Sequence, residues 1–93
     1  MPRYFFDLFN DIEAADDEGR ELPDADAVVA AVLFEVREMI RAAIAESGRI
    51  DLRHRIDVRD ESGNIVYVMH FEDAVTIQRG DEILNRASIR ISA

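Results

Sequence analysis

The stretch MPRYFFDL, residues 1–8, decides the fold together with EGRELPD, residues 18–24. The first stretch begins a strand over residues 3–9, and both faces of this strand are apolar. One face carries Tyr4, Phe6 and Leu8, and the other carries Phe5, Asp7 and Phe9. The second stretch turns at Gly19 and ends at Asp24, whose carboxylate can accept hydrogen bonds from the first turn of a helix. The sequence therefore predicts a strand, a turn and a capped helix.

One long helix is predicted over residues 25–47, with Gly48 as the left-handed residue that ends it. Its apolar side chains form an arc that is broader than an ordinary core-facing stripe. The arc contains Val28, Val29, Val32, Leu33, Val36, Met39, Ile40, Ala43 and Ile44. Phe34 lies outside it. Because about 23 helical residues span roughly 35 Å and a seven-residue strand spans roughly 23 Å, we expect the helix to overhang its sheet.

A second hairpin is predicted after the helix. Residues 54–59 and 65–71 alternate as strands do, and residues 60–64 have the composition of a turn. Residues 12–16 form a weaker return strand before the helix. The order ββαββ predicts a two-layer α+β fold, in which an antiparallel sheet of about four strands packs on one long helix. Residues 3–9 and 65–71 are apolar on both faces, so we expect these two strands to be central and the other two to lie at the edges.

The length of the chain suits one domain, which we place at residues 1–77. Residues 78–93 are expected to form a C-terminal extension, either a short helix and strand or a segment that a partner orders. Cysteine is absent, which excludes disulfides and thiolate chemistry. No apolar run reaches the roughly 20 residues of a membrane span, and no signal-peptide pattern opens the chain, so we expect a cytoplasmic protein without membrane contact.

The charge of the chain is acidic and unevenly distributed. The net charge is −9, and residues 7–26 contain nine acids but only one base, Arg20. Such a chain repels phosphate backbones, which disfavours general nucleic-acid binding. A modest basic stripe consists of Arg49, Arg53, Arg55 and Arg59. This stripe is either an exposed strand face that pairs with acids or a surface that docks on the acidic segment of another copy.

These elements resemble a family of short uncharacterised proteins from rhizobia and related alphaproteobacteria. Its members open with a Pro-Arg-Tyr-Phe-Phe run, carry an acidic Glu-Gly…Glu-Leu-Pro-Asp turn before one helix, and end in an Asp…Gly hairpin and a Phe-x-Asp-Ala-Val-x-Ile segment. The matching segments here are residues 2–6, 18–24, 60–63 and 71–77. Many members have histidine where this chain has Asp7. The family is a domain of unknown function, so the resemblance implies a fold and a bacterial source but no reaction.

Acid–base chemistry has few candidates in this sequence, namely His54, His70, Asp57 and Asp73. No serine, cysteine or second base accompanies the histidines at a useful spacing. No catalytic triad, glycine-rich phosphate loop or metal-binding histidine pair is present. We therefore expect no enzyme, no cofactor and no metal site. The acidic turn at residues 16–21 offers oxygen ligands for Ca²⁺, but its spacing differs from that of an EF-hand loop, so a solvated turn is preferred.

The strongest functional indication is apolar surface in excess of one helix-on-sheet interface. The interface candidates are Phe5, Phe9, Phe34, Val66, Val68, Ile89 and Ile91. They predict a small non-enzymatic interaction or regulatory module that self-associates, with a homodimer favoured and another protein as a further partner. The alternative is a small-molecule binder or minor enzyme with a pocket near His54, Tyr67 and His70. An antitoxin-like partner of a DNA-associated complex is supported only by small size and mixed fold.

Overall fold

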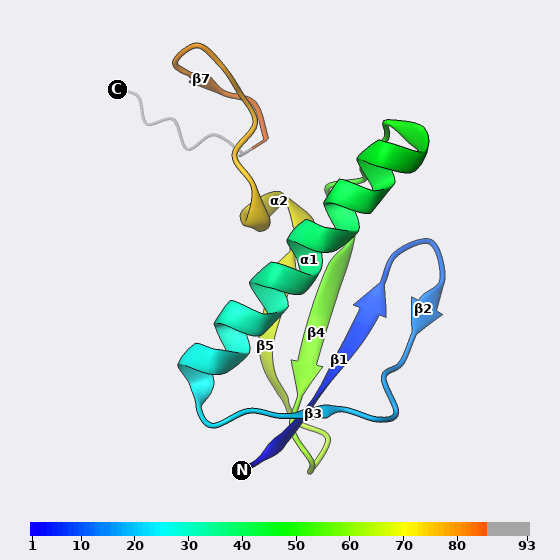
Figure 1. Cartoon of the computed structure of the whole chain (residues 1–93), viewed down its shortest axis with the longest axis vertical. Helices are drawn as coiled ribbons and strands as arrows, with labels where there is room; N and C mark the ends of the chain where they lie inside the picture. Colours follow the sequence, from blue (N-terminus) through cyan, green and yellow to red (C-terminus); the bar gives the residue numbers. More distant parts are fainter. Residues whose placement is uncertain (86–93) are drawn as a thin grey trace.

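A helix and a β-sheet enclose one apolar core in the computed structural model, which describes residues 1–85 of the chain (Figure 1). The elements in chain order are β1 (Arg3–Phe9), β2 (Glu13–Ala14), β3 (Arg20–Glu21), α1 (Ala25–Ser47), β4 (Arg55–Arg59), β5 (Ile65–His70), α2 (Phe71–Ala74), β6 (Gln78–Arg79) and β7 (Glu82–Ile83). The predicted α+β class, with an antiparallel sheet and one main helix, is confirmed. The ββαββ order holds only roughly, because short strands are added before α1 and after α2.

The main helix, α1, begins and ends where the sequence predicts. Asp24 caps it by accepting a 2.9 Å hydrogen bond from the N–H of Ala27. Gly48 ends it with a left-handed φ of 72°, and its N–H donates to the carbonyls of Ala43 and Ile44. α1 crosses the sheet diagonally, and its first turns lie beyond the β5 side of the sheet in Figure 1. The helix therefore overhangs its sheet, as its length predicts.

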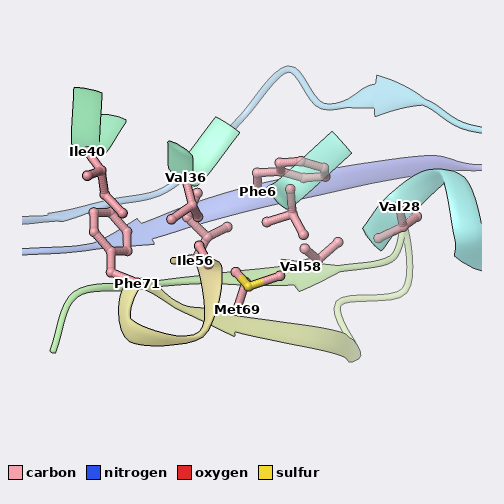
Figure 2. Packing of buried hydrophobic residues seen from close by; sticks show 10 residues of the cluster. Phe6, Val28, Val36, Ile40, Ile56, Val58, Met69 and Phe71 are labelled. Carbon is pink, nitrogen blue, oxygen red and sulfur yellow. The ribbon is translucent and has the colours of Figure 1, made fainter. Parts of the chain in front are cut away.

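The core lies between α1 and one face of the sheet (Figure 2). Buried α1 residues recur every four positions, which places them on one face of the helix: Val28, Val32, Val36 and Ile40. The strands and α2 complete the core with Phe6, Ile56, Val58, Met69, Phe71 and Ala74. Branched aliphatic side chains from both layers interdigitate here and exclude water. This apolar contact is the main term that holds the helix on the sheet.

The main sheet runs in the order β2-β1-β4-β5, with antiparallel neighbours, and β3 pairs with the same strand β1. The central strands are therefore β1 and β4. The prediction that residues 65–71 form a central strand and residues 54–59 an edge strand is wrong. β4 can lie in the centre because its outward charges are paired with partners inside the chain, as the next subsection shows. β5 lies at the edge although its side chains are apolar on both faces.

The chain leaves the sheet at Phe71, which begins the short helix α2 rather than ending the predicted strand. The guanidinium of Arg37 in α1 donates to the carbonyl of Ala74 at 2.8 Å and so attaches α2 to α1. The turn from strand to helix also buries the Phe71 ring in the core.

A small hairpin follows α2. β6 and β7 pair with each other, and among residues 1–85 they pair with no strand of the main sheet. Buried Asn85 donates to the carbonyls of Glu72 and Val75 and thereby joins the hairpin to α2. The division between residues 1–77 and 78–93 stays a prediction. The interface candidates Ile89 and Ile91 lie outside the described residues.

Candidate functional site

The outer edge of β1 is closed by the segment between residues 10 and 24. β2 covers one end of this edge and β3 covers the other. Between them the carboxylate of Asp16 accepts the N–H of Phe6 at 2.9 Å. The N–H of Asp16 donates in turn to the carboxylate of Asp7 at 2.9 Å. Asp16 therefore supplies the hydrogen bonds that a longer β2 would have made.

The Asp16 carboxylate also shapes the turn that follows it. Its other oxygen accepts the N–H groups of Glu18 and Gly19, each at 3.0 Å. Burial raises the pKa of Asp16, but the backbone donors and nearby Arg20 together outweigh burial, so this pKa lies below its usual value. Both oxygens of Asp16 therefore accept backbone hydrogen bonds, one from β1 and the other from the turn that follows.

Gly19 is required by the close approach of this turn to β1. Its φ is +71°, a conformation that residues with a side chain rarely adopt. A Cβ atom at this position would lie 2.8 Å from the ring of Phe5 and 2.9 Å from the carbonyl oxygen of Tyr4. The glycine of the acidic turn therefore has a structural role, because it lets the covering segment lie directly against β1.

Charged side chains form a paired row on the face of the sheet that points away from α1. Asp7 and Asp57 lie directly opposite each other on β1 and β4, and two like charges in this position repel. Arg59 donates to Asp7 at 2.7 Å and to the carbonyl of Asp16 at 2.8 Å, and Arg55 donates to Asp57 at 2.8 Å. Each carboxylate thus has its own guanidinium, which stabilises a charged row in the centre of the sheet.

The same two arginines cover the aromatic rings of β1. The guanidinium of Arg59 lies 4.7 Å from the ring centre of Phe5, and that of Arg55 lies 4.2 Å from the ring centre of Phe9. Both contacts have the geometry of cation–π interactions. Phe5 and Phe9 are half-buried in consequence and offer little open apolar surface. The two arginines of the stripe on β4 are therefore engaged within the chain, and Arg59 is paired with the acidic segment of its own chain.

The outer edge of β5 differs from that of β1. Among residues 1–85 no strand pairs with it. Ile65, Val66 and Val68 are exposed, with exposed fractions of 59%, 49% and 38%. The strand contains no Asp, Glu, Lys, Arg or Pro. An uncharged edge strand of this kind is a template for pairing with another chain.

Phe34 is also exposed, at 64%, but it lies on another side of the molecule. It is two positions from Val32 and from Val36, which is about 200° around a helix, whereas both valines face the sheet. Phe34 therefore points away from the sheet. Val68 lies opposite Asp57 and shares the outer face of the sheet with it. Those predicted interface residues that lie within residues 1–85 do not form one continuous patch.

A pocket of about 300 Å³ lies between the first turns of α1 and the β4–β5 hairpin. Its lining residues are Tyr4, Ala25, Val28, Val29, Asp60, Val66 and Tyr67. Tyr67 thus lines a pocket, but the two histidines predicted beside it do not. His70 is exposed at the other end of β5, and His54 lines a separate open depression. The structure does not bring His54, Tyr67 and His70 together.

His54 instead meets two aspartates that the sequence did not connect with it. Asp11 follows β1, and Asp51 precedes β4 by a few residues. One ligand atom from each of the three side chains lies within 4.8 Å of the others. The antiparallel register, with Phe9 opposite Arg55, brings these two connections to the same end of the sheet. Asp51 and His54 are three residues apart, but no local motif could have added Asp11, which lies 40 residues before Asp51.

A family model described as "Domain of unknown function (DUF6894)" matches residues 3–72. The chain belongs to this family. The match begins at β1 and ends within α2, so the DUF6894 region includes both the covered edge of β1 and the open edge of β5. No curated protein and no solved structure matches the chain. Membership of a family of unknown function is thus confirmed, whereas the alphaproteobacterial source and the opening motif stay predictions.

Within residues 1–85, no helix is both long enough and apolar enough to cross a bilayer.

Proposed function

We propose that this DUF6894 chain is a non-enzymatic interaction module that forms a homodimer through β5. The observation that carries the proposal is the open edge of β5, an uncharged strand with exposed apolar side chains. Sheet edges in native proteins are usually covered, charged or interrupted by proline. The β1 edge of this sheet is covered. Within residues 1–85 no strand pairs with the β5 edge, and β5 carries no Asp, Glu, Lys, Arg or Pro. The one irregularity here is a register shift between Val58 and Arg59, which lies beside Ile65.

The backbone of β5 is arranged to accept another strand. The N–H of Phe71 donates to the carbonyl of His54 at 2.9 Å, which marks a hydrogen-bonded pair between the two chain segments. Hydrogen-bonded and non-hydrogen-bonded pairs alternate along antiparallel strands. Met69, opposite Ile56, therefore bonds to β4, whereas Val68 turns its N–H and C=O toward the open edge.

A second copy of the same strand suits this edge. In an antiparallel pair with Val68 opposite the partner's Val68, the two residues exchange both of their hydrogen bonds. Val66 then lies opposite the partner's His70, and no two like charges oppose each other, because the strand carries no acid, lysine or arginine. The same residues form the interface on both copies, as two-fold symmetry requires.

The position of α1 adds apolar contact to this pairing. Its first turns lie beyond β5 in Figure 1, on the side where an added strand would lie. Ala25 and Val29 from these turns line a pocket together with Val66 of β5. An added strand would therefore meet apolar side chains from the helix as well as from β5, and burial of these groups would stabilise the dimer.

The proposal is tested by the solution mass, measured by light scattering after size exclusion at low and high salt. We expect a dimer at both salt concentrations, because backbone pairing and apolar contacts are not screened as surface charges are. Val68→Lys, which places a charge on the edge, should give a monomer. Phe34→Glu is the matched control, since it alters an even more exposed apolar residue away from β5, and it should remain a dimer.

A monomeric wild-type chain at all concentrations would contradict the proposal. A dimer that Phe34→Glu dissociates and Val68→Lys does not would also contradict it and would assign the interface to the outer face of α1. Dissociation by salt alone would favour the charge-driven docking considered from the sequence.

The pocket beside Tyr67 supports a second candidate function, the binding of a small apolar molecule. Its volume of about 300 Å³ is at the lower end of the range for ligand sites. Titration of a panel of small aromatic molecules, followed by NMR, should give saturable shifts at Tyr67 and Val29 if this function is real. Val29→Phe, which fills the pocket, should abolish them. Shifts that do not saturate would exclude this candidate for the molecules used.

A further inference from the structure

Three side chains that commonly bind metals converge at the end of the sheet where β1 stops and β4 starts. The Nε2 atom of His54 lies 3.7 Å from Oδ1 of Asp11 and 3.5 Å from Oδ2 of Asp51. These atoms belong to two separate connections, one after β1 and one before β4. The cluster lies near the His70 end of β5, whereas the pocket beside Tyr67 lies toward the Ile65 end. The two sites share no lining residue.

The Nε2 atom of His54 points into this cluster without a hydrogen-bond partner. It has less than 1 Å² of exposed surface, and within residues 1–85 it is the only buried side-chain nitrogen or oxygen without a partner. The imidazole ring is fixed by an edge-on contact with the ring of Phe71, with 5.5 Å between the ring centres. A buried polar atom that makes no bond destabilises a protein by about 1–3 kcal/mol. The unpartnered nitrogen therefore points to a ligand from outside residues 1–85 between the three side chains.

The spacing of the three atoms fits a metal ion better than direct hydrogen bonds. Distances of 3.5 Å and 3.7 Å are longer than ordinary N–H···O bonds. Two ligands at about 2.0–2.1 Å from a tetrahedral Zn²⁺ ion are separated by about 3.4 Å. The observed separations are close to this value, so an ion can enter with small side-chain shifts.

Arg53 holds one of the two carboxylates in place. Its backbone N–H and its guanidinium both donate to Asp51, at distances of 3.0–3.2 Å. These three hydrogen bonds fix the orientation of the Asp51 carboxylate. A hydrogen bond from a neighbouring group to a ligating carboxylate is a usual feature of metal sites, because it orients the ligand.

We propose that Asp11, Asp51 and His54 bind a divalent transition-metal ion of the Zn²⁺ type. The imidazole ligand favours Zn²⁺ over Ca²⁺ and Mg²⁺, which prefer oxygen ligands alone. Three protein ligands leave a fourth position for water or for a small anion. The ion would also connect the turn after β1 to the segment before β4 and so stabilise this end of the sheet. This site does not depend on the β5 dimer.

The test is calorimetric titration of the full chain with ZnCl₂ at pH 7.5, with Ca²⁺ as a second cation. We expect one saturable site per chain for Zn²⁺ and no comparable heat for Ca²⁺. His54→Gln should weaken Zn²⁺ binding at least tenfold. His70→Gln is the matched control, because it removes the other histidine of the chain, and it should leave binding unchanged.

Asp11→Asn provides a variant that cannot fail through misfolding, since the Asp11 side chain is 93% exposed. It should also weaken binding at least tenfold. The proposal is overturned if Zn²⁺ does not bind saturably, if Asp11→Asn binds as the wild type does, or if His70→Gln weakens binding as much as His54→Gln.

Discussion

The two edges of the sheet differ in how they are covered. The edge of β1 is covered by β2, β3 and the Asp16 carboxylate, whereas no strand within residues 1–85 pairs with the edge of β5. The residues that cover β1 are acidic and hydrogen-bonded, and the residues that β5 exposes are apolar and uncharged. About 15 residues of the chain therefore close the edge of β1, whereas within residues 1–85 the edge of β5 stays open.

The comparison teaches that an edge can be closed without a full strand. β2 and β3 are two residues each, and one side chain fills the interval between them. Such a closure depends on a few contacts and is sensitive to single substitutions. Within residues 1–85 the β5 edge has no comparable contacts, so under the proposed dimer substitutions there should change association rather than folding.

The largest expected effect comes from Gly19→Ala, which breaks the closed edge. The new Cβ would meet the Phe5 ring and the Tyr4 carbonyl at 2.8–2.9 Å in a left-handed conformation. Conformational strain and overpacking together should lower the free energy of unfolding by about 3 kcal/mol. Chemical denaturation measures this change.

Gly48→Ala is the matched control for that experiment. Gly48 has a φ of 72°, close to that of Gly19, but nothing lies within 4 Å of its added Cβ. Gly48→Ala should therefore lower the free energy of unfolding only through conformational strain, by about 1 kcal/mol. Equal losses in the two variants would show that the contact between the turn and β1 contributes nothing to stability.

A smaller effect is expected from Asp16→Asn. The amide keeps the shape of the side chain but loses the charge and one of the two acceptor oxygens, so the free energy of unfolding at pH 7 should fall by about 2 kcal/mol. The lowered pKa of Asp16 means that its contribution is complete above the ordinary value of 3.8 and is lost as the pH falls through the lower folded-state value. The difference between wild type and variant should therefore shrink below about pH 4.

Asp17→Asn serves as the control, because this neighbouring carboxylate is exposed. It should change stability by less than about 0.5 kcal/mol. A wild-type–variant difference for Asp16→Asn that stays constant from pH 7 to pH 2 would contradict the assigned role of the carboxylate. Denaturation at a series of pH values gives both results.

Local patterns were sufficient to predict most of the fold. Alternation predicted β1, and the Asp24 cap and Gly48 stop predicted both ends of α1, because these signals act within one element. Strand order was predicted incorrectly because burial was inferred from each strand alone. Arg59 of β4 is satisfied across strands, by Asp7 of β1, and no single-strand pattern contains that information.

The candidate sites were harder to predict from the sequence, because they too depend on contacts between different strands. Phe5 and Phe9 were counted as open apolar surface, but arginines from β4 cover both rings. The cluster of Asp11, Asp51 and His54 forms only when β1 and β4 are paired. Val66 and Val68 were identified correctly as exposed, because their exposure follows from the composition of one strand.

Residue-resolved hydrogen exchange tests the difference between the two edges most directly. The amide of Phe6, bonded to Asp16, should be protected at every protein concentration, because its edge is closed within one chain. The amide of Val68 should exchange rapidly in dilute solution and become protected as the concentration rises, because in the proposed dimer a second copy covers it. Rapid exchange of Val68 at all concentrations, or an unprotected Phe6 amide, would contradict the account of one closed edge and one edge that serves as the interface.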